Sequence, residues 1–148
     1  MAHLNIGCGN DLLSGYVNAD ISPYVNADVV CRLGDILPFT DNQFEKVRAY
    51  NVLTQIEKNS EFVLAMNELH RITKKGGYIE IRVPNALHIC AFQDSMDCRR
   101  FTDQSFTYMQ NKHRRYNQYG KHYGYPPFDV ALVEDNLRQM IFKLWPVK

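Results

Sequence analysis

The sequence predicts an α/β fold: a seven-stranded, mostly parallel sheet with a C-terminal antiparallel hairpin and a reduced complement of helices. Short strand-like segments alternate with helical or loop segments as far as residue 83, a pattern typical of a parallel sheet. Two further strand-like segments close the chain around a tight turn, which adds an antiparallel edge. Residues 1–148 are expected to form a single domain, because this length is near the commonest domain size.

Four short strands are expected in the first third of the chain. The first is stopped by Gly7, and the fourth follows the turn-forming residues Thr40–Asn42. The four strands are His3–Ile6, Tyr16–Asp20, Asp28–Arg32 and Lys46–Asn51.

One long helix is expected to begin at Asn59 or Ser60 and to end near Thr73, because apolar residues recur at helical spacing between them. The two lysines that follow suit the negative end of the helix dipole, and Gly76 suits the position just after the helix.

The second half of the chain is expected to hold three strands. Tyr78–Val83 alternates between apolar and polar residues, as a strand does. The stretch from about 86 to 127 is expected to be irregular, apart from a short helix between Thr102 and Met109. Phe128–Val133 and Gln139–Trp145 are expected to form the closing hairpin.

The connections after the first two strands are too short for full helices. Only the seven residues Ile21–Ala27 separate the second and third strands, whereas a parallel crossover usually needs about 10–12 residues. One face of the sheet should therefore be thinly covered. Apolar surface left open in this way is usually buried by a partner, so a homodimer is expected.

The composition is that of an ordinary soluble globular protein, with 45% hydrophobic and 22% charged residues and a net charge of +1. The small net charge disfavours a whole-surface nucleic-acid binder. No apolar run approaches the roughly 18 residues of a membrane span, so no membrane partner is expected. Strand-like sequence begins at His3, which leaves no room for a signal peptide.

The cysteines and histidines indicate neither a disulfide framework nor a metal site. No two cysteines are separated by two residues, and the histidines form no HxxxH pair. The four cysteines are therefore expected to be reduced thiols in the core of a cytoplasmic protein. They are Cys8, Cys31, Cys90 and Cys98.

Gly7-Cys8-Gly9, directly after the first strand, is the first candidate binding site. Glycines there let a ligand approach the backbone, and Asp20 at the end of the second strand can accept both hydroxyls of a ribose. The dinucleotide pattern GxGxxG is not met, because Leu12 stands at its third glycine. S-adenosylmethionine (SAM) is cationic and has no phosphate, so this loop suits SAM better than NAD. Taken alone, these residues are also compatible with a plain turn.

Several motifs lie along nearly the whole chain: LNIGCG at 4–9, GYVNADI at 15–21, LPFTDNQF at 37–44, NVLTQI at 51–56, ELHRI at 68–72 with GG at 76–77, VPN at 83–85 and DSMDCRRFT at 94–102. Together they resemble the LNLGCG…GWxNVDI, LPFxDNSFD, HVLEHI, ExxRVLKPGG…VPN and DPxHVRxFT segments of small class I SAM-dependent methyltransferases, of the methyltransferase type 11 kind. The resemblance implies a Rossmann-like class I methyltransferase sheet and SAM as the cofactor.

The resemblance also implies roles for single residues. Gly7, Cys8 and Gly9 would border the methionine part of SAM, Asp20 would hold the ribose, Ile21 and Leu33 would meet the adenine, and Asn51 would line the methyl-transfer side.

The chain departs from the family pattern at five positions. Arg32 stands where the family has the aspartate of a D-L pair, Asn51, Thr54 and Gln55 replace the H, E and H of HVLEH, and Asp97 replaces the histidine of DPxH. These changes leave the catalytic residues unassigned. Two functions stay open: a methyltransferase acting on a small or nucleotide-like acceptor, and a non-catalytic module of the same fold that acts by SAM binding or protein association. An NAD-dependent oxidoreductase is disfavoured, because the phosphate-binding pattern is missing.

Residues 98–125 form a basic, tyrosine-rich segment with six of the seventeen Lys and Arg residues and one of the sixteen acids. Because the segment leaves the fifth strand at the edge where ligands bind, we expect it to reach over the site as a lid. Arg99, Arg114 and Arg115 would then bind an anionic acceptor, such as a phosphorylated sugar; a nucleic-acid end is possible but not favoured. The alternative is a solvated loop whose tyrosines pack on the sheet.

Overall fold

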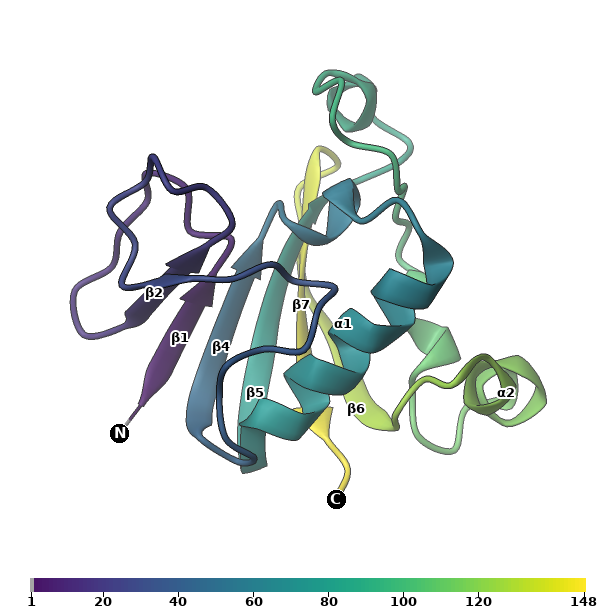
Figure 1. Cartoon of the computed structure of the whole chain (residues 1–148). Helices are drawn as coiled ribbons and strands as arrows, with labels where there is room; N and C mark the ends of the chain where they lie inside the picture. The colour runs from purple at the N-terminus through teal and green to yellow at the C-terminus, as the bar shows by residue number, and fades with distance from the viewer. Residues whose placement is uncertain (1) are drawn as a thin grey trace.

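The structure, a computed structural model, describes residues 2–148 and contains one seven-stranded sheet in the order β3-β2-β1-β4-β5-β7-β6 (Figure 1). Strands β1 to β5 pair in parallel, and β7 is antiparallel to both β5 and β6. The strands are β1 (His3–Ile6), β2 (Val17–Asp20), β3 (Val29–Val30), β4 (Phe44–Tyr50), β5 (Thr73–Pro84), β6 (Phe128–Asp135) and β7 (Gln139–Pro146). The helices are α1 (Asn59–Ile72) and the short α2 (Lys121–Tyr123), with single turns at Leu53–Gln55, Ile89–Phe92, Ser105–Tyr108 and Tyr116–Gly120. The predicted fold class is confirmed.

Helix α1 covers one face of the sheet and builds the core with it. Phe62, Met66 and Leu69 of α1 are buried in the same apolar cluster as Ile79 and Ile81 of β5. Truncating side chains of this kind to alanine costs about 2–5 kcal/mol each, so this single helix stabilises much of the sheet.

The end of α1 differs from the expectation that Gly76 follows the helix. Thr73 is already extended, with φ −85° and ψ 132°, and its hydroxyl donates to the Leu69 carbonyl at 2.7 Å. The chain then passes directly into β5, where residues 74–77 bulge because the register against β4 shifts. Gly76 lies in this bulge and not at the helix end, and its positive φ of +81° is a backbone angle that glycine adopts easily.

Two buried asparagines hold the short loop of residues 10–16 where a crossover helix would otherwise run. The Asn5 side-chain amide donates to the Asp11 carbonyl at 2.8 Å and to Asn18 Oδ1 at 3.0 Å. Asn18 Oδ1 also accepts from the Leu13 backbone N–H at 2.9 Å. Buried amides need hydrogen-bond partners, so these contacts fix the loop without a helix.

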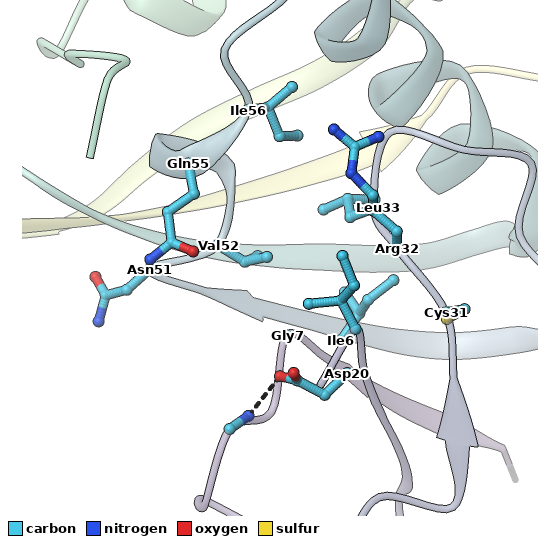
Figure 2. A pocket seen from close by; sticks show the side chains of 12 residues that line it. Ile6, Gly7, Asp20, Cys31, Arg32, Leu33, Asn51, Val52, Gln55 and Ile56 are labelled. Atoms are coloured by element: carbon cyan, nitrogen blue, oxygen red, sulfur yellow. Dashed lines mark hydrogen bonds between the residues drawn. The ribbon is translucent and has the colours of Figure 1, made fainter. Parts of the chain in front are cut away.

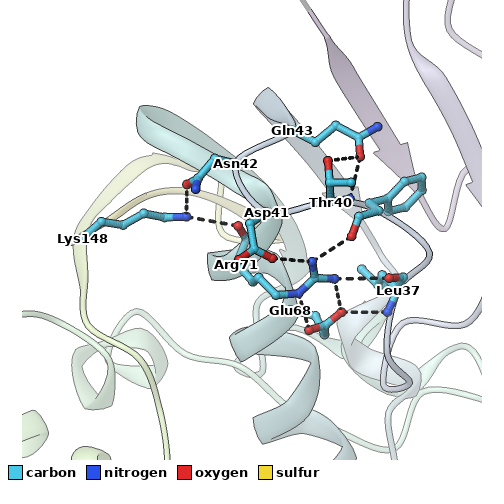
Figure 3. A network of polar contacts seen from close by, with 9 residues as sticks. Leu37, Thr40, Asp41, Asn42, Gln43, Glu68, Arg71 and Lys148 are labelled. Carbon is cyan, nitrogen blue, oxygen red and sulfur yellow. Dashed lines mark hydrogen bonds and ion pairs between the residues drawn. The ribbon is translucent and has the colours of Figure 1, made fainter.

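A second polar network holds the segment between β3 and β4 against α1 (Figure 3). Glu68, only 6% exposed, accepts from the Leu37 backbone N–H at 2.7 Å and from Arg71 at 2.6 Å. Arg71 also donates to the Phe39 carbonyl at 2.7 Å and to Asp41 at 2.9 Å. The hydrogen bond from Arg71 lowers the pKa of Glu68, so the pair is ionised at neutral pH. The ion pair between Glu68 and Arg71 thus holds this segment in place, although the segment contains no crossover helix.

The face of the sheet opposite α1 is polar, against the expectation that apolar surface would be left open. Within the described chain, residues 2–148, no helix lies on this face (Figure 1). The Arg48 guanidinium lies 3.8 Å from the Tyr50 ring, and Tyr50 donates to Glu80 at 2.5 Å. Lys46 and Lys143 approach the same Glu80 at 3.7 and 4.0 Å. Long charged side chains cover the strands here. The homodimer was expected because of exposed apolar surface, and this face does not provide that surface.

Part of the segment of residues 98–125 lies away from the carboxyl ends of the parallel strands. Gln110 pairs with Phe128, the first residue of β6, and β6 begins at the opposite edge of the sheet. Arg115 donates to Gln104 at 2.7 Å, and the Tyr125 ring packs edge-on against Phe62 of α1. The lid expectation is therefore wrong for this part, because Gln110 is held at the start of β6 and Tyr125 packs against α1. Residues 86–97 project beyond the carboxyl edge instead (Figure 1).

The four cysteines are free thiols, but only Cys8 is a buried core residue; Cys31 and Cys90 are half-buried and Cys98 is exposed. The core expectation is thus wrong for three of them, which lie in loops or at a strand end. None of the helices formed by residues 2–148 is long and apolar enough to cross a membrane.

Candidate active site

The glycine loop after β1 and the end of β2 are joined by Asp20 (Figure 2). Asp20 accepts from the Gly9 backbone N–H at 2.8 Å and from the Ser22 backbone N–H at 2.9 Å. Gly7 has φ +66°, and a Cβ there would lie 2.5 Å from a methyl group of Val52. Glycine is therefore required at Gly7 both for its backbone angle and for the close approach of the chain after β4.

A cavity of about 320 Å³ opens above this loop, at the small end of the roughly 300–1,000 Å³ of ligand pockets. Six of the seven cofactor residues expected from the sequence line it, whereas Cys8 is buried behind the loop. The lining residues are Ile6, Gly7, Gly9, Asp20, Ile21, Cys31, Arg32, Leu33, Asn51, Val52, Gln55 and Ile56. Four of these residues were not predicted to line a site: Ile6, Cys31, Val52 and Ile56. For the first three, a position at or just after a strand end is the signal that would have identified them.

Asp20 and Arg32 are the charged residues among those that line this cavity. Arg32 pairs with Glu61 of α1 at 2.7 Å and with Asp35 at 3.1 Å. Because two carboxylates balance Arg32, Asp20 gives this cavity its negative character.

The two thiols near the cavity are not nucleophiles. Burial, reinforced by Asp20, raises the pKa of Cys31 to about 11, and burial also raises the pKa of Cys8. Both groups are therefore protonated at neutral pH, and only a thiolate attacks. Cys31 is a small apolar wall group of the cavity, and Cys8 packs behind the loop.

Asn51 connects the first cavity with a second one. It follows β4 with a left-handed φ of +54°, which is uncommon for residues other than glycine. Its side-chain oxygen is buried and has no hydrogen-bond partner among residues 2–148. The second cavity, of about 360 Å³, is lined by Asn51, Pro84, Cys90, Gln93, Asp94, Asp97, Arg138 and Gln139.

Two of the departures from the family pattern contact each other. Thr54, 2% exposed, donates from its hydroxyl to Asp97 at 2.7 Å. Gln55, a third departure, lines the first cavity. Thr54 and Asp97 thus replace the family residues with a hydrogen-bonded pair.

The three arginines expected to bind an acceptor are not brought together. Arg99 lines a third cavity, of about 360 Å³, beside Tyr108 and Tyr123. There it donates to the Ile56 carbonyl at 3.1 Å. Arg114 and Arg115 line none of the cavities described in residues 2–148.

Comparison with known families gives a match to the methyltransferase domain over residues 4–81, more than half of the chain. An uncharacterized methyltransferase of Schizosaccharomyces pombe is 40% identical over 63 residues, which cover 41% of this chain and 22% of that protein. The chain thus matches about a fifth of that relative's length.

Solved structures give the same fold at low sequence identity. A protein from Pyrococcus horikoshii has a TM-score of 0.68 at 14% identity, covering 99% of this chain and 82% of that one. A possible histamine N-methyltransferase from Thermotoga maritima has a TM-score of 0.65 at 14% identity, with coverages of 99% and 82%. A putative methyltransferase from Haloferax volcanii, solved with the Trm112 activator, has a TM-score of 0.61 at 17% identity, with coverages of 99% and 83%.

Proposed function

Because this chain belongs to the methyltransferase-domain family, of the class I SAM-dependent type, we propose that it binds SAM in the first cavity and methylates an acceptor in the second. The observation that carries the proposal is the shared residue Asn51, which lines both cavities. A methyl group held beside Asn51 would lie between the two sites.

The residues of the first cavity fit SAM. Each Asp20 oxygen accepts one backbone N–H and keeps a second lone pair for a ribose hydroxyl. A Cβ on Gly9 would meet nothing within 4 Å, so the backbone is open to the amino-acid part of the cofactor. The negative character given by Asp20 suits a cationic ligand. When bound, SAM supplies an electrophilic methyl group on a sulfonium.

The contribution of this chain to methyl transfer is mainly positioning, which alone lowers barriers by several kcal/mol. The Asn51 side chain lines both cavities, so its amide can hydrogen-bond to the methyl acceptor and orient the lone pair of the atom to be methylated. An amide is not a base, so an acceptor that must lose a proton would give it to Asp94 or Asp97 across the second cavity.

We place the acceptor in the second cavity and not beside Arg114 and Arg115, because the second cavity shares Asn51 with the first, whereas the other cavities described in residues 2–148 share no residue with it. Arg99 remains a candidate contact for an anionic group, but in the third cavity. The non-catalytic alternative is not favoured, since the glycine loop, Asp20 and the second cavity are all present. Free thiols suit the cytoplasm, which we keep as the proposed location.

Calorimetry with SAM and S-adenosylhomocysteine tests the proposal. We expect both to bind with one-to-one stoichiometry and NAD not to bind. Folded protein that binds neither of the first two ligands would refute the assignment of the first cavity.

A further inference from the structure

Four large apolar side chains are strongly exposed in the two segments that line the second cavity. They come from residues 86–97, which project beyond the sheet edge (Figure 1), and from the turn between β6 and β7. Ile89 is 80% exposed, Phe92 60%, Met96 69% and Leu137 75%. We call these four residues the rim.

The rim is continuous with the cavity along the chain. Each rim residue is the immediate neighbour of a residue that lines the second cavity, and these neighbours are Cys90, Gln93, Asp97 and Arg138. The two segments also touch, since the Cys90 thiol donates to the Arg138 carbonyl at 3.2 Å. Polar lining residues and exposed apolar residues therefore stand next to one another in these two segments.

The exposure of the rim is fixed by backbone contacts at both ends of the projecting segment. The Asn85 backbone N–H donates to the Arg138 carbonyl at 2.8 Å, and the Cys98 N–H donates to the Thr54 carbonyl at 2.9 Å. Within the segment, the Met96 backbone N–H donates to Asp94 at 2.9 Å. A folded protein that holds apolar side chains in water around a cavity usually covers them with the ligand or partner that it binds.

From this juxtaposition we infer that the acceptor is an amphiphile with an amine head group. The amine would enter as its ammonium form, lose a proton to Asp94 or Asp97, and use the freed lone pair to take the methyl group as the bond between that group and the sulfonium sulfur breaks. The head group enters the second cavity, where Asp94 and Asp97 face the single Arg138, and the apolar part lies on the rim. The inference rests on the proposed function, because it takes the second cavity as the acceptor site. A macromolecular partner would bury the rim but would not need the charged floor beneath it.

The test uses n-butylamine, n-hexylamine and n-octylamine as probes, titrated into protein saturated with S-adenosylhomocysteine. We expect affinity to rise by about two- to fourfold for each added methylene, as its surface leaves water. In the double variant Ile89→Asp/Met96→Asp this dependence on chain length should vanish. The matched control is Ile36→Asp, whose side chain is 79% exposed but borders none of the cavities described in residues 2–148. It should keep the full dependence.

Three results would overturn the inference: no dependence on chain length in the wild type, the same loss in the control as in the rim variant, or rim-dependent binding to phosphatidylcholine vesicles without binding of the amines. The last result would make the rim a membrane-docking surface. Binding of S-adenosylhomocysteine is measured first in every variant. Its absence from folded wild-type protein would refute the proposed function, whereas its presence without amine binding would refute only the acceptor class.

Discussion

Replacing Asp20 is the most direct test of the cofactor site. Asp20→Ala removes the proposed acceptor for two ribose hydroxyls and also the acceptor for the backbone N–H groups of Gly9 and Ser22. A hydrogen bond to a charged group contributes about 1.5–3 kcal/mol. Loss of one such net contribution lowers affinity by about 10- to 150-fold. Both backbone N–H groups can donate to water in the open cavity instead. The cost in folding stability should therefore be about 1–2 kcal/mol, near the lower end of the cost of a lost hydrogen-bond partner.

Calorimetry with S-adenosylhomocysteine measures the affinity, and urea unfolding measures the stability. Asp28→Ala is the matched control, because Asp28 accepts from the Asn18 backbone N–H at 2.7 Å but does not line the cavity. This control should lose similar stability and keep its affinity within about twofold. Asp20→Asn, which keeps one oxygen acceptor, should fall between Asp20→Ala and the wild type.

Equal affinity of Asp20→Ala and the wild type would show that the ribose is held elsewhere. An equal loss in Asp28→Ala would show that the effect comes from loosening of the strand ends and not from a ligand contact.

Three further predictions concern Arg32 and Asn51 at the site and His70 near the end of α1. Arg32→Asp alone would place a carboxylate against Glu61, which now lies 2.7 Å from Arg32, and should destabilise the fold. The double variant Arg32→Asp/Glu61→Arg restores an ion pair. It should bind S-adenosylhomocysteine more tightly than the wild type, because a guanidinium only donates hydrogen bonds and cannot accept one from the adenine amino group. Weaker calorimetric binding by the double variant would disprove that adenine contact. Asn51→Ala should cost about 1 kcal/mol in urea unfolding, because φ is +54°, and Asn51→Gly should cost less; equal costs would contradict this account. Burial lowers the folded-state pKa of His70, so the unfolded chain binds protons more readily and the free energy of unfolding should fall as pH drops below about 6.5. His70→Phe should flatten this part of the plot of stability against pH. An unchanged slope would exclude His70 as its source.

The sequence by itself determined the alternation of strands and helix, the closing hairpin and the lining residues Gly7, Gly9 and Asp20. These features depend on local physics: side-chain periodicity, turn chemistry and the backbone freedom of glycine all act within a few residues. Alternation in β4 also contained the answer about the open face, because Lys46 and Arg48 alternate there with buried Val47 and Ala49. The expected apolar surface was wrong, because the short connections between strands show only that helices are missing. The polarity of the uncovered face is set by the side chains of the strands themselves.

The end of α1 shows the limit of local signals. A glycine after a helical stretch fits a helix end and a strand bulge equally well. Only the pairing of β5 with β4 decided that Gly76 belongs to the bulge.

Tertiary structure alone decided which distant groups meet. Arg32 meets Glu61 across 29 residues, and Thr54 meets Asp97 across 43. The pairing of Gln110 with the start of β6 likewise carries the basic segment away from the strand ends. No local pattern encodes such pairs, because each depends on how separately folded segments close on a common core, and that closure is set by the packing of the whole chain.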